Sequence, residues 1–192
     1  MLSRARMTSQ RREDFLRWFG RSKIVDQTGN PRIVYHGTTR SFDLFRSGKR
    51  NPELGFHFGS ASLAAWFATY DEERGTLSGG NIRLVYLRIE NPLRLPDIFV
   101  RGRESSEDAA HWLYRDGLID KTDRTKIFRA RSASDAHARL VKIIETIGHD
   151  GIVYENDQEG GTADSNEDSY AVFWPHQIRS VFEIDRCYLT ID

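Results

Sequence analysis

Strand-like runs in this sequence are short, and most are closed within a few residues by glycine or proline. Runs rich in β-branched and aromatic residues recur at 32–35, 55–59, 82–89, 152–154, 170–174 and 178–184. Apolar residues at helical spacing predict helices at 9–19, 60–68, 105–116 and 134–147. Helices and strands do not alternate strictly, which disfavours a doubly wound parallel sheet. The pattern predicts the α+β class.

The composition suits one soluble domain. We expect a basic N-terminal extension over residues 1–14, followed by a single domain over residues 15–192. Lys+Arg and Asp+Glu both number 28, and a net charge of zero argues against a general nucleic-acid or membrane binder. No apolar run approaches the roughly 18 residues of a transmembrane helix. Cys187 is the only cysteine, which excludes an internal disulfide framework and a cysteine-rich zinc site.

Residues 35–38, Tyr-His-Gly-Thr, close one strand-like run. His36 can donate a hydrogen bond to a sugar hydroxyl, and Gly37 lets a ligand approach the backbone closely. A backbone N–H and C=O together match a planar carboxamide. The alternative is a histidine that serves only the local structure.

Two flat side chains come from the strand at 55–59 and from the helix after it. His57 and Phe67 can sandwich an aromatic ring between them. The alternative places Phe67 in the core and His57 on the surface. His57 is also a candidate general base, because the ordinary pKa of histidine lies near neutral.

The acidic loop over residues 155–168 could place a carboxylate at the lip of a strand, where it would stabilise an oxocarbenium-like centre. A calcium loop starting at Asp157 fails, since Thr162 and Asp168 occupy the positions of the invariant glycine and glutamate. No metal is expected. Neither a Walker-type loop nor a GxGxxG motif is present.

Six segments together resemble the ADP-ribosyltransferases of the diphtheria-toxin and poly(ADP-ribose) polymerase type, with a histidine–tyrosine–glutamate scheme. The likeness is strongest to the small phage, polymorphic-toxin and effector enzymes of bacteria, and it spans residues 15–181. The segments are 18–23, 29–31, 35–38, 91–93, 150–154 and 172–180.

The resemblance implies a split sandwich of two mostly antiparallel sheets, with flanking helices and a central NAD cleft. It implies that His36 contacts the adenosine ribose, that Gly37 binds the nicotinamide carboxamide, and that Thr38 supports the loop. His57 and Phe67 take the places of the two stacking tyrosines. The residues implied to bind NAD are His36, Gly37, Thr38, His57, Phe58 and Phe67.

The family glutamate falls on Ser169 in this sequence. Side chains alternate along a strand, so Glu167 would share the face of Ser169. We therefore expect Glu167 and His57 to be the catalytic residues. Asp168, which should point the other way, and Glu155 are the other candidate acids, and the remaining alternative is that the chain has no catalytic acid.

By resemblance, we expect an NAD-dependent mono-ADP-ribosyltransferase, a bacterial toxin or effector that acts in the cytoplasm of a target cell after secretion or injection. Its acceptor would be a protein before a nucleic acid, and an immunity or host activator protein would fit the family. A substrate-recognition loop would include Glu155, Asp157, Glu159, Asp168 and Ser169. The alternatives are an NAD glycohydrolase, a nucleic-acid ADP-ribosyltransferase and a non-catalytic module that binds NAD or a partner.

Overall fold

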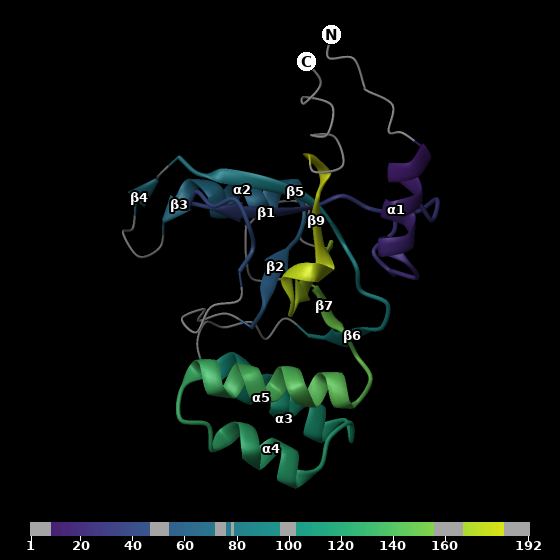
Figure 1. The fold of residues 1–192 in the computed structure, drawn as a ribbon. Coiled ribbons are helices and arrows are strands. Elements are labelled where there is room, and N and C mark those ends of the chain that lie inside the picture. The colour runs from purple at the N-terminus through teal and green to yellow at the C-terminus, as the bar shows by residue number, and fades with distance from the viewer. Residues whose placement is uncertain are drawn as a thin grey trace.

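The computed structural model describes residues 9–46, 54–71, 76–77, 79–96, 103–155 and 167–182 of the chain. These ranges form helices and strands whose arrangement is drawn in Figure 1. The α-helices are α1 (Ser9–Phe19), α2 (Ala61–Thr69), α3 (Arg103–Arg115), α4 (Lys121–Phe128) and α5 (Ala133–Thr146). The strands are β1 (Val34–Thr38), β2 (Phe56–Phe58), β3 (Tyr70–Asp71), β4 (Thr76–Leu77), β5 (Asn81–Leu87), β6 (Pro92–Leu95), β7 (Gly151–Glu155), β8 (Asp168–Val172) and β9 (Ile178–Ser180).

The strands form two larger sheets and a small hairpin. The three-stranded sheet has the order β1-β5-β9 and is antiparallel throughout. The four-stranded sheet has the order β2-β8-β7-β6, and only its β6–β7 pair is parallel. Strands β3 and β4 pair with each other. The α+β prediction is therefore confirmed.

The two larger sheets meet at an isolated bridge between Tyr35 and Gly59. Tyr35 N–H donates to Gly59 O at 3.1 Å, and Gly59 N–H donates to Tyr35 O at 3.0 Å. Next to this bridge, residues of both sheets build one apolar core. Its buried members include Val34, Phe58, Val85, Leu87, Tyr170 and Val172.

Helices α3, α4 and α5 cover the opposite face of the four-stranded sheet, at the lower end of Figure 1. Adjacent residues of a strand point to opposite faces, so Tyr170 enters the core between the sheets while Ala171 enters the helical core. Ser169 lies two residues before Ala171 and therefore shares the helix-covered face. This second core includes Leu113, Ile127, Leu140, Ile144, Ile152, Ala171 and Phe173.

Helix α2 packs closely on the three-stranded sheet because two glycines leave room for it. A Cβ on Gly37 would overlap the carbonyl oxygen of Ala64, and one on Gly80 would overlap that of Ala68. Ser60 begins the helix, since its Oγ accepts a hydrogen bond from Leu63 N–H at 3.2 Å. The helix expected at 60–68 is confirmed as α2.

The other predicted helices are confirmed as α1, α3 and α5, whereas α4 was not predicted. Only Ile127 of α4 is buried, so the apolar period that reveals an amphipathic helix is missing. Strand β6 was also missed. The predicted domain boundary between residues 14 and 15 falls inside α1.

Two strand predictions need correction. The strand expected at 32–35 runs through Thr38 as β1, because β5 supplies pairing partners as far as Asn81. The strand expected at 178–184 ends at Ser180, whose Oγ accepts a hydrogen bond from Phe182 N–H at 3.2 Å and so favours a helical turn. Residues 183 and 184 lie outside the described ranges. Within those ranges, no helix combines the length and apolar character needed to cross a bilayer.

Candidate functional site

Gly37 presents its backbone at the outer edge of β1. In an antiparallel pair, the N–H and C=O groups of successive residues point alternately to the two sides of the strand. Tyr35 directs both groups toward Gly59, away from β5. Gly37, two residues further on, must also direct its N–H and C=O away from β5, and β1 is an outer strand of its sheet among the described strands.

His36 and His57 connect the two sheets beside this edge. A carbonyl oxygen can only accept, so His36 Nδ1–H donates to His57 O over 2.8 Å. This bond fixes the hydrogen of neutral His36 on Nδ1 and leaves Nε2 as the acceptor nitrogen. A sugar hydroxyl would therefore donate to neutral His36, the reverse of the direction expected from the sequence.

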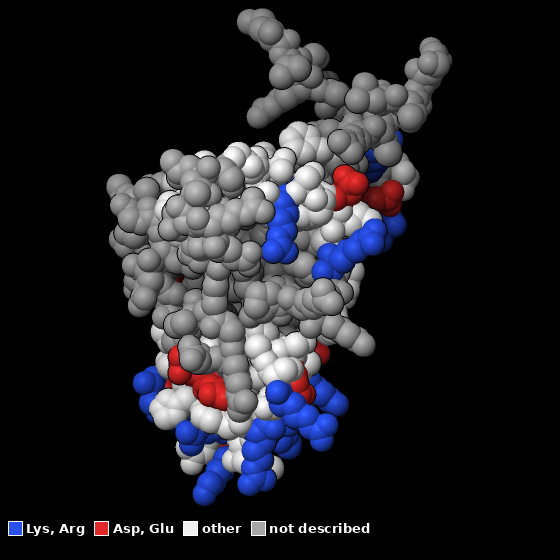
Figure 2. All heavy atoms as spheres, turned by 90° about the vertical axis from the view of Figure 1, so that its left-hand side faces the viewer, with Lys and Arg blue, Asp and Glu red and all other residues white. Residues whose placement is uncertain are grey.

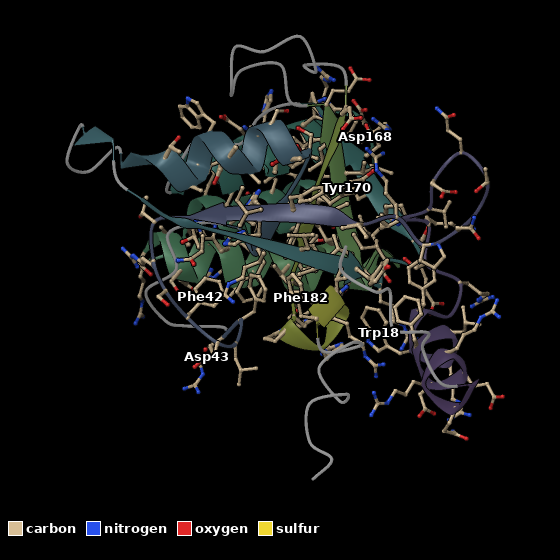
Figure 3. The ribbon with its side chains drawn as sticks, turned by 90° about the horizontal axis from the view of Figure 1, so that it is seen from above. Trp18, Phe42, Asp43, Asp168, Tyr170 and Phe182 are labelled. Carbon is tan, nitrogen blue, oxygen red and sulfur yellow. The ribbon has the colours of Figure 1, made fainter. Side chains whose placement is uncertain are left out.

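Phenylalanine rings hold the His36 ring in place. The centroids of Phe42, Phe45 and Phe58 lie 6.0, 5.2 and 5.6 Å from that of His36. Phe42, which is labelled in Figure 3, and Phe45 belong to the segment between β1 and β2. Phe58 is 2% exposed and points into the core between the sheets. Its expected part in NAD binding stays a prediction.

The His57 side chain meets Tyr154, which comes from β7. His57 Nδ1 lies 3.0 Å from the Tyr154 hydroxyl oxygen, and the two groups form a hydrogen bond. Tyr154 is 3% exposed. Its register partner on β8 is Ser169. Tyr154, Ser169 and His57 therefore share the helix-covered face of the four-stranded sheet.

Ser169 stands where the resemblance places a glutamate. It is 1% exposed, and its Oγ lies 3.1 Å from the point where a Cβ on Gly59 would be. Leu63 of α2 lies against the same point of Gly59. A short hydroxyl thus occupies the position, and it can donate or accept a hydrogen bond but cannot supply a fixed negative charge.

Glu167 lies just before β8 and forms an ion pair with Arg32. Glu167 Oε2 and Arg32 Nη2 are 3.1 Å apart, and the glutamate side chain is 48% exposed. Because Glu167 precedes the paired residues of β8, the register does not fix its face. Arg32 leads into β1, so the ion pair places this carboxylate beside the entry to the strand that carries His36 and Gly37.

Asp168 points away from Ser169, as its position in the strand predicts. Figure 3 shows it nearer the end of β8 than Tyr170. Arg94 donates to both oxygens of Asp168, at 3.0 and 2.8 Å, and also lies 3.9 Å from Glu155. The hydrogen bond to Asp168 raises the pKa of Arg94. Asp168 and Glu155 are thus gathered around one guanidinium at the other face of the sheet.

The comparisons with known proteins identify the class of the chain. The family model described as ADP-ribosyltransferase in polyvalent proteins matches residues 26–185. The chain belongs to this ADP-ribosyltransferase family. No curated protein matches it. One solved structure, a crystal structure of an anti-CRISPR protein, aligns with 78% of this chain and 95% of its own chain. The two chains are 12% identical, and the TM-score of 0.32 is too low to show a shared fold.

The remaining residues expected to bind NAD in this ADP-ribosyltransferase lie on β1 and α2. Thr38 Oγ1 accepts a hydrogen bond from Arg40 N–H at 3.1 Å and so turns the chain after β1. Phe67 lies on α2, where its ring packs edge-on against Trp66 with centroids 4.8 Å apart. Asp157 and Glu159 of the expected recognition loop lie outside the described residues.

Sequence reasoning missed Tyr154 and Arg32 as partners of the candidate site residues in this ADP-ribosyltransferase. Tyr154 lies in a buried strand, and a hydroxyl on a buried residue needs a hydrogen-bond partner, which was an available signal. Arg32 is a lone arginine after a proline turn, and such a residue gives no sequence signal of its partner. In the described part of the chain, no three His, Cys, Asp or Glu side chains group around a point that could hold a metal ion.

Proposed function

We propose that this enzyme is an NAD-dependent mono-ADP-ribosyltransferase that transfers ADP-ribose to a macromolecular acceptor, with a protein as the first candidate. Enzymes of this class use NAD as substrate. The bond between nicotinamide and ribose breaks, and nicotinamide leaves as a neutral molecule with the electron pair. The acceptor's nucleophile attacks the ribose carbon and loses its proton. A bacterial toxin or effector is the biological role that goes with this proposal.

The edge of β1 at Gly37 is the observation that carries the proposal. A carboxamide has one donor group and one acceptor atom side by side, which is also what a strand residue presents along its edge. Gly37 directs its N–H and C=O toward that edge. Nicotinamide can therefore bind there as a further strand residue would, through two hydrogen bonds.

Rings from two elements would hold the pyridine in our proposal. His57 lies on β2, where it shares a hydrogen bond with the Tyr154 hydroxyl, and Phe67 lies on α2; in this proposal both rings contact the pyridine. Orientation by a buried partner reduces the entropy that a ring loses when it stacks on a ligand. Nε2 of His36 would accept a hydrogen bond from the more distant ribose.

Glu167 is our candidate for the catalytic carboxylate. Positive charge builds up on the ribose as nicotinamide departs, and a nearby anion lowers the energy of that state. Glu167 is the one acidic residue of the described chain next to the lead-in to β1 through its ion pair with Arg32. In this proposal it turns toward the ribose when NAD binds, and Arg32 limits its freedom before then.

The test compares three single variants, Glu167→Gln, Asp168→Asn and Glu155→Gln, by the release of nicotinamide from NAD. We expect Glu167→Gln to lower kcat by about 100-fold or more, the usual cost of losing a group that stabilises transition-state charge. The other two variants should stay within a few-fold of the wild type. Unchanged kcat in Glu167→Gln, with circular dichroism like that of the wild type, would remove Glu167 from the mechanism.

Labelled NAD incubated with a cell lysate identifies the acceptor. Label on protein supports the proposed function, whereas label removed by nuclease indicates a nucleic-acid acceptor. Free ADP-ribose without labelled macromolecule indicates an NAD glycohydrolase. Intact NAD and no label would overturn the enzymatic proposal for this chain.

A non-catalytic module is the second candidate, and the hydroxyl of Ser169 at the glutamate position favours it. Such a module would keep the Gly37 edge and the His57 ring, yet lack the anion that chemistry requires. Calorimetry with NAD and a turnover assay separate the two candidates. Tight binding of NAD without turnover supports the non-catalytic module.

A further inference from the structure

A groove of about 430 Å³ lies between α4 and α5, on the helical layer that covers the four-stranded sheet. Figure 2 shows Lys and Arg side chains gathered over this end of the molecule. The groove is lined by Lys121, Thr122, Thr125, Lys126, Arg129 and Arg139. Every charged group in the lining is therefore a cation.

The zero net charge of the chain conceals this local excess of positive charge. Residues 121–142 carry only two acidic side chains, Asp123 and Asp135. The same stretch carries seven basic ones, which are Lys121, Arg124, Lys126, Arg129, Arg131, Arg139 and Lys142. The rest of the chain must therefore carry the compensating excess of acid. Polyanions respond to local charge, so a net charge of zero does not exclude a nucleic-acid partner at this surface.

Two of the four groove cations are held in place by carboxylates at the rim. Lys126 Nζ lies 2.6 Å from Asp123, and Arg139 Nε lies 2.8 Å from Asp135. Arg139 Nη1 also donates to the Lys126 carbonyl oxygen at 2.7 Å, which fixes the guanidinium across the two helices. These contacts prearrange the groove before any partner arrives.

The other two groove cations, Lys121 and Arg129, have no carboxylate partner among the described residues. Lys121 begins α4 and Arg129 follows its last residue, so the two charges mark the two ends of the groove along this helix. An eight-residue helix is about 12 Å long. That span exceeds a single phosphate group and suits successive phosphates of a polymer.

We propose that the α4–α5 groove binds the phosphate backbone of a nucleic acid. Nucleic-acid interfaces are more polar and more positively charged than interfaces between proteins, which depend on a buried apolar centre. The groove offers cations and the hydroxyl of Thr122, and both kinds of group contact phosphate oxygens. The groove lining contains no large apolar side chain that could anchor a protein partner. Such contacts carry no sequence information, so the binding is sequence-independent.

The test measures binding of a fluorescent random-sequence DNA duplex, and of an RNA of the same length, over a range of salt concentrations. The groove variant is Lys121→Gln with Arg129→Gln. The control is Arg12→Gln with Arg17→Gln on α1, which removes the same charge from exposed positions away from the groove. NAD is absent from the assay, so its outcome is independent of the proposed function.

We expect the wild type and the control to bind at least one of the two polymers, with affinity that falls as salt rises. The groove variant should bind more weakly, and its plot of log K against log salt should be less steep by about 2, roughly one for each cation removed. Three results would overturn the proposal: no binding by the wild type, equal losses in both variants, or competition by poly-glutamate or ATP as effective as that by unlabelled nucleic acid. Effective competition by poly-glutamate would indicate an acidic protein as the partner. Effective competition by ATP would indicate a small phosphorylated ligand.

Discussion

His57 Nδ1 and the Tyr154 hydroxyl oxygen lie 3.0 Å apart, although their strands are separated by β8 in the sheet. The contact is diagonal, because the register partner of Tyr154 is Ser169 and that of His57 is Ala171. Small side chains at both β8 positions leave the space that the two rings cross. Ser169, which stands where the resemblance places a glutamate, therefore belongs to the same local arrangement that orients His57.

Substitution of Tyr154 by Phe tests whether this bond positions His57 for catalysis. The ring stays in the core, and only the hydroxyl is lost. We expect unfolding free energy to fall by about 1 kcal/mol, the usual net worth of one hydrogen bond. If His57 works on NAD in the orientation seen here, kcat for NAD cleavage should also fall several-fold, and the His57 resonances should show a more mobile ring in NMR spectra.

Tyr170→Phe is the matched control for that variant. Tyr170 is also a buried tyrosine of the four-stranded sheet, but it points into the core between the sheets, and burial raises its pKa. Its hydroxyl can be removed without touching His57. Because Tyr170 also lies near Arg32 and Glu167, the NMR signals of His57 decide the comparison. A His57 ring that is equally mobile in both variants would show that Tyr154 acts through general stability.

Gly37→Ala tests the packing of α2 on β1. The added Cβ would overlap the Ala64 carbonyl oxygen, so the helix must shift away from the strand. We expect the variant to lose about 1–3 kcal/mol of unfolding free energy, the usual cost of overpacking. Gly79→Ala is the control, since a Cβ there meets nothing within 4 Å. Urea denaturation of both variants checks the difference, and equal stability would contradict the close packing.

The sequence predicted the elements whose burial follows a simple period. The helix expected at 134–147 is α5, in which Ala136, Leu140 and Ile144 recur on the buried face; Ser132, which the prediction did not use, caps the first turn. Both signals are local and need no knowledge of the fold. The unpredicted α4 has an N-cap at Asp120 but almost no apolar face, since its exposed side forms the basic groove.

The side-chain contacts of the candidate site could not be predicted from a periodic pattern in the sequence. Arg32 and Glu167 are separated by 135 positions, and His57 and Tyr154 by 97. Such contacts depend on strand order and register, which no local pattern specifies. The direction of the Gly37 backbone groups likewise depends on the bridge at Tyr35, which only the fold reveals.

Asp135 should make stability depend on pH in the acid range. The hydrogen bond from Arg139, followed by that from Arg131 N–H, lowers the pKa of Asp135 below its usual 3.8. Because the pKa of Asp135 is lower in the folded protein than in the unfolded chain, its charge stabilises the fold. This stabilisation is complete above pH 3.8 and is lost as the pH falls through the lower pKa of the folded protein. Asp135→Asn should therefore be less stable than the wild type at neutral pH, with a gap that narrows on acidification.

Urea unfolding of both proteins across the acid range measures this gap. A constant gap at every pH would show that the charge of Asp135 plays no part.

Gln177 is a structural residue of the segment at 172–180. We expect substitutions of Gln177 to destabilise the fold and leave the chemistry of the folded protein unchanged. It is 5% exposed. Its Oε1 accepts from Phe173 N–H and Trp174 N–H, both at 3.0 Å, and its Nε2 donates to Asp150 O at 2.6 Å and Arg88 O at 3.2 Å. Gln177→Ala would leave these buried backbone groups without partners, at a total cost of roughly 3 kcal/mol or more.

Gln177→Glu separates the accepting half of the side chain from the donating half. The carboxylate can still accept from the two N–H groups, but it faces two carbonyl oxygens to which it cannot donate. We expect it to be at least as destabilising as Gln177→Ala, because a poorly solvated charge then lies against carbonyl oxygens. Thermal unfolding of both variants gives the order, and NAD cleavage by the folded fraction should match that of the wild type. A lower kcat in fully folded Gln177→Ala would instead assign this residue a part in the reaction.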